Sequence, residues 1–301
     1  MNTHSSEKGV LSSLLHFIIN IKYLLKGKVL IANVLPVFTG FWLALYFSGH
    51  TFSHHFWDFL LTMIASTLVI SGALMFNNWF EHDLDQKMER TKARPTVTGD
   101  FSLRSVLIAA IVSTIVGLGL MLSTTIEAFI YSFLGWFFYV VIYTFWTKRR
   151  YTINTIIGSI SGAFTPLIGW AVIMPANHLI PIALFYILFI WQIPHTIAIA
   201  IKRLGDYRRA GVPMLPVVVG VDAAVRQNMY YILALLPVPI LLYQSLGWIF
   251  SIVSLILNIL WIILAAKGYK VKDKQTWADK NLKFSLIYLI ISLMLMIVLT
   301  I

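Results

Sequence analysis

The chain has 301 residues, of which 59% are hydrophobic and only 12% are charged, about half the charged share of a typical soluble domain. So much apolar surface excludes an ordinary soluble globule and an intrinsically disordered chain. The absence of cysteine excludes disulfides, thiolate metal sites and a cysteine nucleophile. A net charge of +11 would suit a nucleic-acid-binding protein, so the position of the positive charges along the chain has to be explained.

Long segments without Lys, Arg, Asp or Glu predict nine transmembrane helices, because a span needs about 20 apolar residues. Two of the segments are long enough for a pair of helices each, and turn residues divide them near 174–178 and 244–247. The predicted fold class is therefore all-α: a polytopic membrane protein with nine helices around a central cavity. The expected spans lie near residues 29–48, 58–77, 105–124, 128–147, 154–173, 180–201, 225–243, 248–266 and 283–301.

The 23 Lys and Arg residues all fall in the N-terminal segment and in alternate loops, whereas the other loops have none. Because short cytoplasmic loops are rich in Lys and Arg, this pattern predicts a cytoplasmic N-terminus. Topology thus accounts for the positive charge, and no nucleic-acid partner is expected. We interpret residues 1–301 as one integral-membrane domain in which residues 1–28 form a cytoplasmic segment.

Two long cytoplasmic loops, residues 78–104 and 202–224, hold most of the acidic residues, although topology does not require acids there. Seven of the twelve are Glu81, Asp83, Asp85, Glu89, Asp100, Asp206 and Asp222. The two loops lie four helices apart and resemble the functional ends of two similar halves. We expect one carboxylate from each loop to face the other across the cavity.

The first loop predicts a site for a metal ion and a diphosphate. If the preceding helix continues, Asn77, Glu81 and Asp85 lie four residues apart on one face. Oxygen ligands suit Mg²⁺, which takes few carboxylates and completes its shell with phosphate oxygens. Arg90 and Arg94 repeat the spacing and offer planar donors to phosphate. The alternative is a solvated loop whose charges pair with one another.

The second loop follows a helix that contains His195, an ionisable residue within a span and therefore a functional candidate. Its imidazole would serve as a proton acceptor. The alternative is a neutral histidine that is hydrogen-bonded inside the bundle.

These motifs resemble those of the UbiA-type intramembrane prenyltransferases, and within them the branch that farnesylates haem (the haem O synthases). The resemblance runs from about residue 77 to 217. It rests on Asn77 to Asp85 with Met88-Glu89-Arg90-Thr91 and Arg94-Pro95; Tyr143-Thr144 with Lys148-Arg149; Gly162-Ala163-Phe164 with Pro166 to Trp170; and Trp191-Gln192, Pro194-His195, Asp206-Tyr207 and Ala210 to Pro216.

The resemblance implies transfer of a farnesyl group from farnesyl diphosphate to a vinyl group of haem B, with water added, to give haem O and diphosphate. It implies a bacterial plasma membrane as the location, an active site open to the cytoplasm, and a haem A-forming enzyme as a possible partner. The implied Mg²⁺ ligands are Asn77, Glu81, Asp85 and Asp206. The implied catalytic residues are Asp83, Asp85, Arg90, Arg94, Lys202 and Asp206. The implied substrate-binding residues are Asn77, Lys148, Arg149, His195, Arg203 and Tyr207, and the resemblance implies that His195 is an axial ligand to the haem iron.

Two residues depart from the family pattern: Glu81 stands where Asp is usual, and Gly205 stands where a second acid often precedes Asp206. Three other readings stay open. One is a prenyltransferase of the same superfamily that acts on a quinone precursor or another aromatic ring. Another is a membrane transporter, although all acids and bases avoid mid-depth. The third is a paralogue that binds substrate without turnover.

Overall fold

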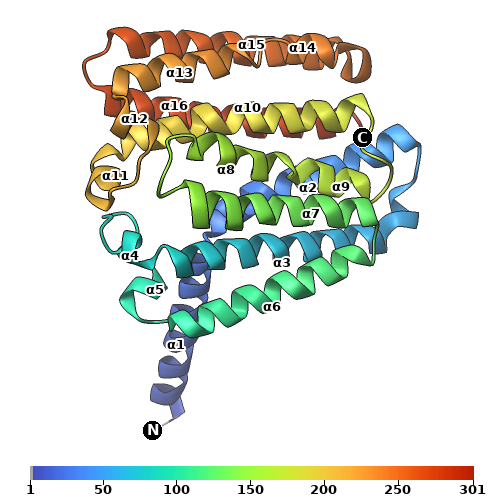
Figure 1. Cartoon of the computed structure of the whole chain (residues 1–301). Coiled ribbons are helices and arrows are strands. Elements are labelled where there is room, and N and C mark those ends of the chain that lie inside the picture. The colour runs from blue at the N-terminus through green and yellow to red at the C-terminus, as the bar shows by residue number, and fades with distance from the viewer. Residues whose placement is uncertain (1–2) are drawn as a thin grey trace.

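The structure is a computed structural model that describes residues 3–301, with side-chain positions from Leu14 onward. Its described residues form helices and no strand, which confirms the all-α prediction. Figure 1 shows long helices stacked side by side in layers. In this part of the chain, seven helical segments are long and apolar enough to cross a membrane. They are α2 (Gly27–Ser48), η1 (Phe52–His55) with α3 (Phe56–Phe80), α6 (Leu103–Leu122), α7 (Ile126–Phe137) with the π-helix η2 (Phe138–Thr147), α10 (Leu179–Lys202), α15 (Tyr243–Lys270) and α16 (Lys274–Val298).

The other two predicted spans are broken into shorter helices by proline. Residues 154–173 form α8 (Asn154–Ala163) and α9 (Thr165–Ala171), with Pro166 in the first turn of α9. Residues 225–243 fall in α13 (Val221–Leu233) and α14 (Val238–Leu241), which are separated by turns around Pro237. Proline lacks the N–H that would continue the ladder of helical hydrogen bonds. The described residues thus provide seven helical segments of membrane length, of which α15 is kinked at Gly247 (φ 78°, ψ −178°), within the predicted turn near 244–247. The count of nine spans stays a prediction.

Small residues allow the helices of the first half to pack closely. A Cβ at Gly40 of α2 would lie 1.9 Å from the carbonyl oxygen of Pro166, and one at Gly169 of α9 would lie 1.9 Å from that of Val37. Gly117 of α6 approaches the backbone of α3 at Val69 in the same way. Close backbone approach of this kind is typical of membrane helices, where van der Waals packing replaces the hydrophobic effect.

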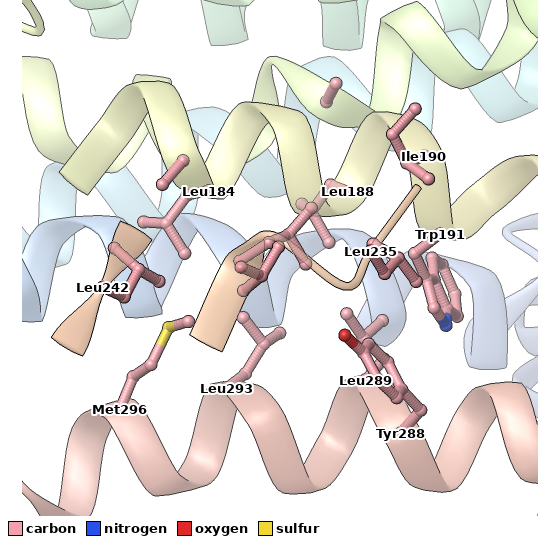
Figure 2. Close-up of a cluster of buried hydrophobic side chains, with 14 of the residues drawn as sticks. Leu184, Leu188, Ile190, Trp191, Leu235, Leu242, Tyr288, Leu289, Leu293 and Met296 are labelled. Carbon is pink, nitrogen blue, oxygen red and sulfur yellow. The ribbon is translucent and has the colours of Figure 1, made fainter. Parts of the chain in front are cut away.

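The second half packs around α10 and α16 through large apolar side chains. Figure 2 shows Leu184, Leu188 and Trp191 of α10 facing Tyr288 and Leu293 of α16. All five are at least 95% buried. Behind this layer, α13 and α15 complete the core of the second half.

Short helices gather at one end of the bundle, opposite the C-terminus (Figure 1). They comprise α4 (His82–Asp85), α5 (Pro95–Thr98), α11 (Leu204–Ala210) and α12 (Leu215–Val218). The N-terminal helix α1 (Thr3–Leu24) leads into α2 close to this end, where it contacts α5. The two acidic loops are therefore at the same end of the molecule.

Candidate active site

Asn77, Glu81 and Asp85 lie on one buried face where α3 gives way to α4. The helix ends at Phe80 and bends at Glu81, whose φ of −95° and ψ of 12° leave the helical region. The four-residue spacing nevertheless continues, because the amide of Glu81 donates to the Asn77 carbonyl at 2.9 Å and that of Asp85 to the Glu81 carbonyl at 2.8 Å. All three side chains are at least 97% buried.

The π-helix η2 and the residue that follows it, Lys148, present two polar side chains to this face. The amide of Asn77 donates to the Thr144 hydroxyl at 3.2 Å, and the ammonium of Lys148 donates to Glu81 Oε2 at 2.5 Å. Burial alone would raise the pKa of Glu81, but the positive charges of Lys148 and Lys26 outweigh it and hold the pKa below its usual value. Glu81 is therefore ionised in the interior, and its second oxygen, Oε1, is buried without a hydrogen-bond partner.

The two acidic loops contact each other directly. The backbone amide of Glu89 donates to Asp206 Oδ1 at 3.3 Å, and the guanidinium of Arg90 donates to the Tyr207 hydroxyl at 3.0 Å. Below these contacts, Met88 packs with Tyr207 and Val212 in a small apolar cluster. Residues separated by more than 110 positions thus build one surface at the end of the bundle.

Each remaining buried acid also has a cationic partner. Arg94 donates to Asp85, and Arg209 donates to Asp206, which is 6% exposed. Arg90 and Arg94 are not on a continuous helix, because turns replace helical structure after Asp85. Their guanidinium groups reach the two acidic loops from a folded turn instead.

Other residues that the sequence pointed to lie outside this cluster. Asp83 is exposed and forms a bidentate pair with Arg149 at 2.7 and 2.9 Å, and these hydrogen bonds hold the pKa of Asp83 below its usual value. Lys202 pairs with Asp279 of α16, and Arg203 is exposed. Among the described residues, the side chains of Lys202 and Arg203 make no hydrogen bond or ion pair to the first acidic loop.

Lys26 is a site residue that the sequence analysis missed, because it was counted among the charges that set topology. Its ammonium donates to the side-chain oxygen of Asn77. Burial of that group, together with the positive charges of Arg94 and Lys148, holds the pKa of Lys26 well below its usual value. Its φ of 48° is the only left-handed conformation at a non-glycine residue in the described chain. Such strain often accompanies functional positions, but no sequence pattern signals it here.

A cavity of about 440 Å³ lies between the helices of the bundle, within the range of roughly 300–1,000 Å³ typical of small-molecule sites. Its lining comes from α2, η2, α8, α9, α10 and α16 and includes Tyr143, Gln192 and His195, but none of the clustered acids. Tyr143 borders both the cavity and the cluster, since the ammonium of Lys148 lies 5.4 Å from the centroid of its ring. A second, smaller cavity of about 70 Å³ shares five lining residues with the first, Tyr139 among them, and α3 and α7 contribute most of the others. Gly162 leaves room for Gln192, since a Cβ there would lie 1.9 Å from its amide nitrogen.

The donor set fits magnesium better than a metal held by protein ligands alone. Among residues with described side chains, no three His, Asp or Glu side chains gather closely enough to enclose a cation. The cluster offers oxygen atoms only, one of them the orphaned Oε1 of Glu81. Mg²⁺ accepts one or two carboxylates when substrate phosphates supply further oxygens. Gly205, where a second acid is usual, is exposed, and a Cβ there would meet only Arg209, at 3.6 Å.

The class is defined by an all-helical bundle of membrane-length helices, with two joined acidic loops at one end and a cavity among the helices. The chain belongs to the UbiA prenyltransferase family, whose model matches residues 33–287. This confirms the resemblance drawn from the motifs.

Two curated relatives are similar to this chain over nearly its whole length. A protoheme IX farnesyltransferase of Oceanobacillus iheyensis is 46% identical over 99% of this chain and 94% of its own length. Protoheme IX farnesyltransferase 2 of Bacillus subtilis is 46% identical over 92% of this chain and 90% of its own length.

Solved structures show the same fold at low identity. A structure described as digeranylgeranylglyceryl phosphate synthase has a TM-score of 0.77 at 20% identity, and the match covers 94% of this chain and 98% of that one. A UbiA homologue from Archaeoglobus fulgidus bound to GPP and Mg²⁺ has a TM-score of 0.65 at 13% identity and covers 92% and 99%.

Proposed function

We propose that this protein transfers a farnesyl group from farnesyl diphosphate to a vinyl group of protohaem IX, and so produces haem O and diphosphate. The observation that carries the proposal is the hydrogen bond between the first loop and Asp206, which joins both acidic loops at one end of the bundle. The names of the relatives that are 46% identical over nearly the whole chain support the choice of farnesyl donor and haem acceptor.

In this proposal Asn77, Glu81, Asp85 and Asp206 hold Mg²⁺ together with the diphosphate. When bound, the metal neutralises the diphosphate and stabilises its departure as an anion. The Archaeoglobus homologue with GPP and Mg²⁺ supports this assignment by its fold.

The basic residues around the acids bind the diphosphate oxygens. Lys26, Arg90, Arg94 and Lys148 surround the cluster, and each already points a donor at an acid or a neighbouring polar group. Preorganised donors of this kind stabilise charge that develops on the leaving group. Asp83 holds Arg149 at the rim through a bidentate pair, which gives it a positioning role.

Cleavage of the allylic C–O bond leaves a farnesyl cation, and the vinyl group of the acceptor supplies the electron pair for the new C–C bond. The carbon left positive by this addition takes up water and releases a proton. The protein contributes no nucleophile. The rings of Tyr139 and Tyr143 line the cavity, where aromatic faces stabilise a cation and apolar walls exclude premature water.

We also infer the orientation from the charge pattern. Nine spans, a cytoplasmic N-terminus and an active site open to the cytoplasm of a bacterial cell agree with the placement of α4, α5 and α11 at one end of the bundle. The product, a hydroxyfarnesylated haem, would pass to an enzyme that forms haem A.

The test incubates membranes that contain the protein with farnesyl diphosphate, Mg²⁺ and either haem B or 4-hydroxybenzoate, and analyses the products by mass spectrometry. The expected result is a haem whose mass increases by a farnesyl group and a hydroxyl group, formed only with haem B. A prenylated benzoate without a modified haem would support the alternative acceptor class. Absence of both products from membranes with confirmed protein would contradict the proposal.

A further inference from the structure

His195 of α10 lines the central cavity and is held by two neighbours. Its Nδ1 atom lies 2.7 Å from the hydroxyl oxygen of Ser285 on α16. Its ring stacks on Trp191, with a centroid separation of 4.7 Å and an interplanar angle of 24°. The indole N–H of Trp191 in turn donates to the backbone carbonyl of Ser285 at 2.6 Å. The imidazole therefore has one fixed orientation.

The contacts of Ser285 decide which ring nitrogen carries the proton. A serine hydroxyl has a single hydrogen. The Ser285 oxygen lies 2.7 Å from the carbonyl oxygen of Leu282, which is an acceptor only. The hydroxyl must donate to that carbonyl, because two oxygens without a hydrogen between them repel at this distance. The Ser285 oxygen can then act towards Nδ1 only as an acceptor, through one of its two lone pairs, so His195 is protonated at Nδ1.

The same reasoning leaves Nε2 with a free lone pair. Nε2 has no hydrogen-bond partner among the described side chains, and the residue borders the cavity. An imidazole whose Nδ1–H is fixed by a neighbouring acceptor is the usual arrangement of a histidine that ligates a metal. The aliphatic side chains of Leu282 and Leu286 border the cavity next to His195 and offer a flat ligand an apolar wall.

From this geometry, and resting on the proposed function, we propose that Nε2 of His195 is the axial ligand to the iron of the haem acceptor. We further propose that Ser285 is the positioning residue that fixes the required tautomer. Iron ligation would orient the porphyrin ring in the cavity and so determine which vinyl group faces the farnesyl donor. The substrate class is a metalloporphyrin, and the metal itself contributes to recognition.

The test measures binding of haem and of metal-free protoporphyrin IX to detergent-purified protein, by Soret absorbance and by porphyrin fluorescence. Both ligands have the same ring and carboxylates, so only iron ligation separates them. We expect His195→Ala to weaken haem binding at least 10-fold, to leave protoporphyrin binding within twofold, and to regain the Soret spectrum on addition of imidazole. We expect Ser285→Ala to weaken haem binding by about 10-fold, as is usual when a hydrogen-bond partner of a metal-binding histidine is lost.

Two further variants on α16 control for structural damage. Ser285→Thr keeps the hydroxyl and should restore the wild-type spectrum. Ser292→Ala removes a hydroxyl of similar burial that has no hydrogen-bond partner and should change neither affinity. Equal loss of haem and protoporphyrin binding in His195→Ala would overturn iron ligation. Unchanged haem binding in Ser285→Ala would overturn the role of Ser285.

Product analysis separates this inference from the proposed function. If His195→Ala binds both ligands as the wild type does while haem is still farnesylated, the ligation proposal fails and the proposed function stands. If the wild type forms no farnesylated haem, the proposed function fails, whatever the binding results.

Discussion

Asp206→Asn is the substitution that separates chemistry from folding most cleanly. The carboxylate is 94% buried, accepts the amide of Glu89 at 3.3 Å and pairs with Arg209. Asparagine has almost the same shape and keeps one oxygen for the Glu89 amide, so the contact between the two loops should survive. What is lost is one negative charge at the proposed metal–diphosphate site.

The structure allows the effect of this substitution on stability to be compared with its effect on the reaction rate. The guanidinium side chain of Arg209 is 54% exposed, so its pair with Asp206 is screened by solvent and contributes about 0–1 kcal/mol to stability. Loss of a preorganised charged group that stabilises a transition state costs about 2.7–4 kcal/mol, which is a factor of about 10²–10³ in rate. We expect kcat/KM to fall by that factor while the thermal stability in detergent changes little.

The assay measures farnesylated haem per quantity of immunodetected protein across a Mg²⁺ titration. Asp222→Asn is the matched control, because Asp222 lies in the same loop but is 78% exposed and pairs with Lys274 at 3.1 Å. It should retain activity within twofold. Arg209→Gln tests whether release of the arginine alone explains the loss. Activity of Asp206→Asn within threefold of wild type, at normal protein level, would refute the reasoning.

Four other outcomes follow from the same geometry. Chelation with EDTA should abolish turnover, and added Mg²⁺ should restore it. The melting temperature should stay nearly constant, because every buried acid of the site has a cationic partner. Loss of the fold on chelation would argue for a structural metal. Lys26→Met should raise the KM for farnesyl diphosphate about 10- to 100-fold, since hydrogen bonds to charged groups contribute about 1.5–3 kcal/mol. Lys22 is exposed, and Lys22→Met should leave the KM unchanged. Equal KM values for the two variants would remove Lys26 from the site. Gly40→Ala should destabilise the protein by about 1–3 kcal/mol or more, because the new Cβ would clash with the backbone at Pro166. Gly119 faces open space, so Gly119→Ala should leave the stability unchanged. Equal melting temperatures for the two variants would contradict the close approach of α2 and α9. Gly162→Ala should displace the Gln192 amide into the cavity, so haem binding should weaken more than the fold does, and unchanged binding would count against that role.

Much of the fold was predictable because each step follows from simple physical constraints. Apolar length defined the long helices, and the positions of Lys and Arg indicated which loops share an end. The meeting of the loops around Asp85 and Asp206 was expected from their equivalent places in two similar halves. Proline could also have warned of the break at α8 and α9, since Pro166 cannot continue the helical ladder.

The details of the site depend on contacts between segments that sequence spacing does not reveal. Lys26 enters the cluster only because the end of α1 meets the end of α3, where the Asn78 amide binds the Leu24 carbonyl. Asp83 lies between Glu81 and Asp85 in the chain but faces outward to Arg149, because two residues along a helix reverse the direction of a side chain. Ser285 has no motif around it, and only the packing of α10 against α16 brings it to His195.

One of the two hydrogen bonds described between the loops uses the main chain of residue 89 and not its side chain. Almost any amino acid can supply that N–H, so the identity of the residue is free to drift, whereas the number of residues that separates it from Asp85 is not. A deletion of one residue between positions 85 and 89 would carry the amide past its acceptor and pull the arginines with it. In this segment the protein should tolerate amino-acid substitutions far better than insertions or deletions.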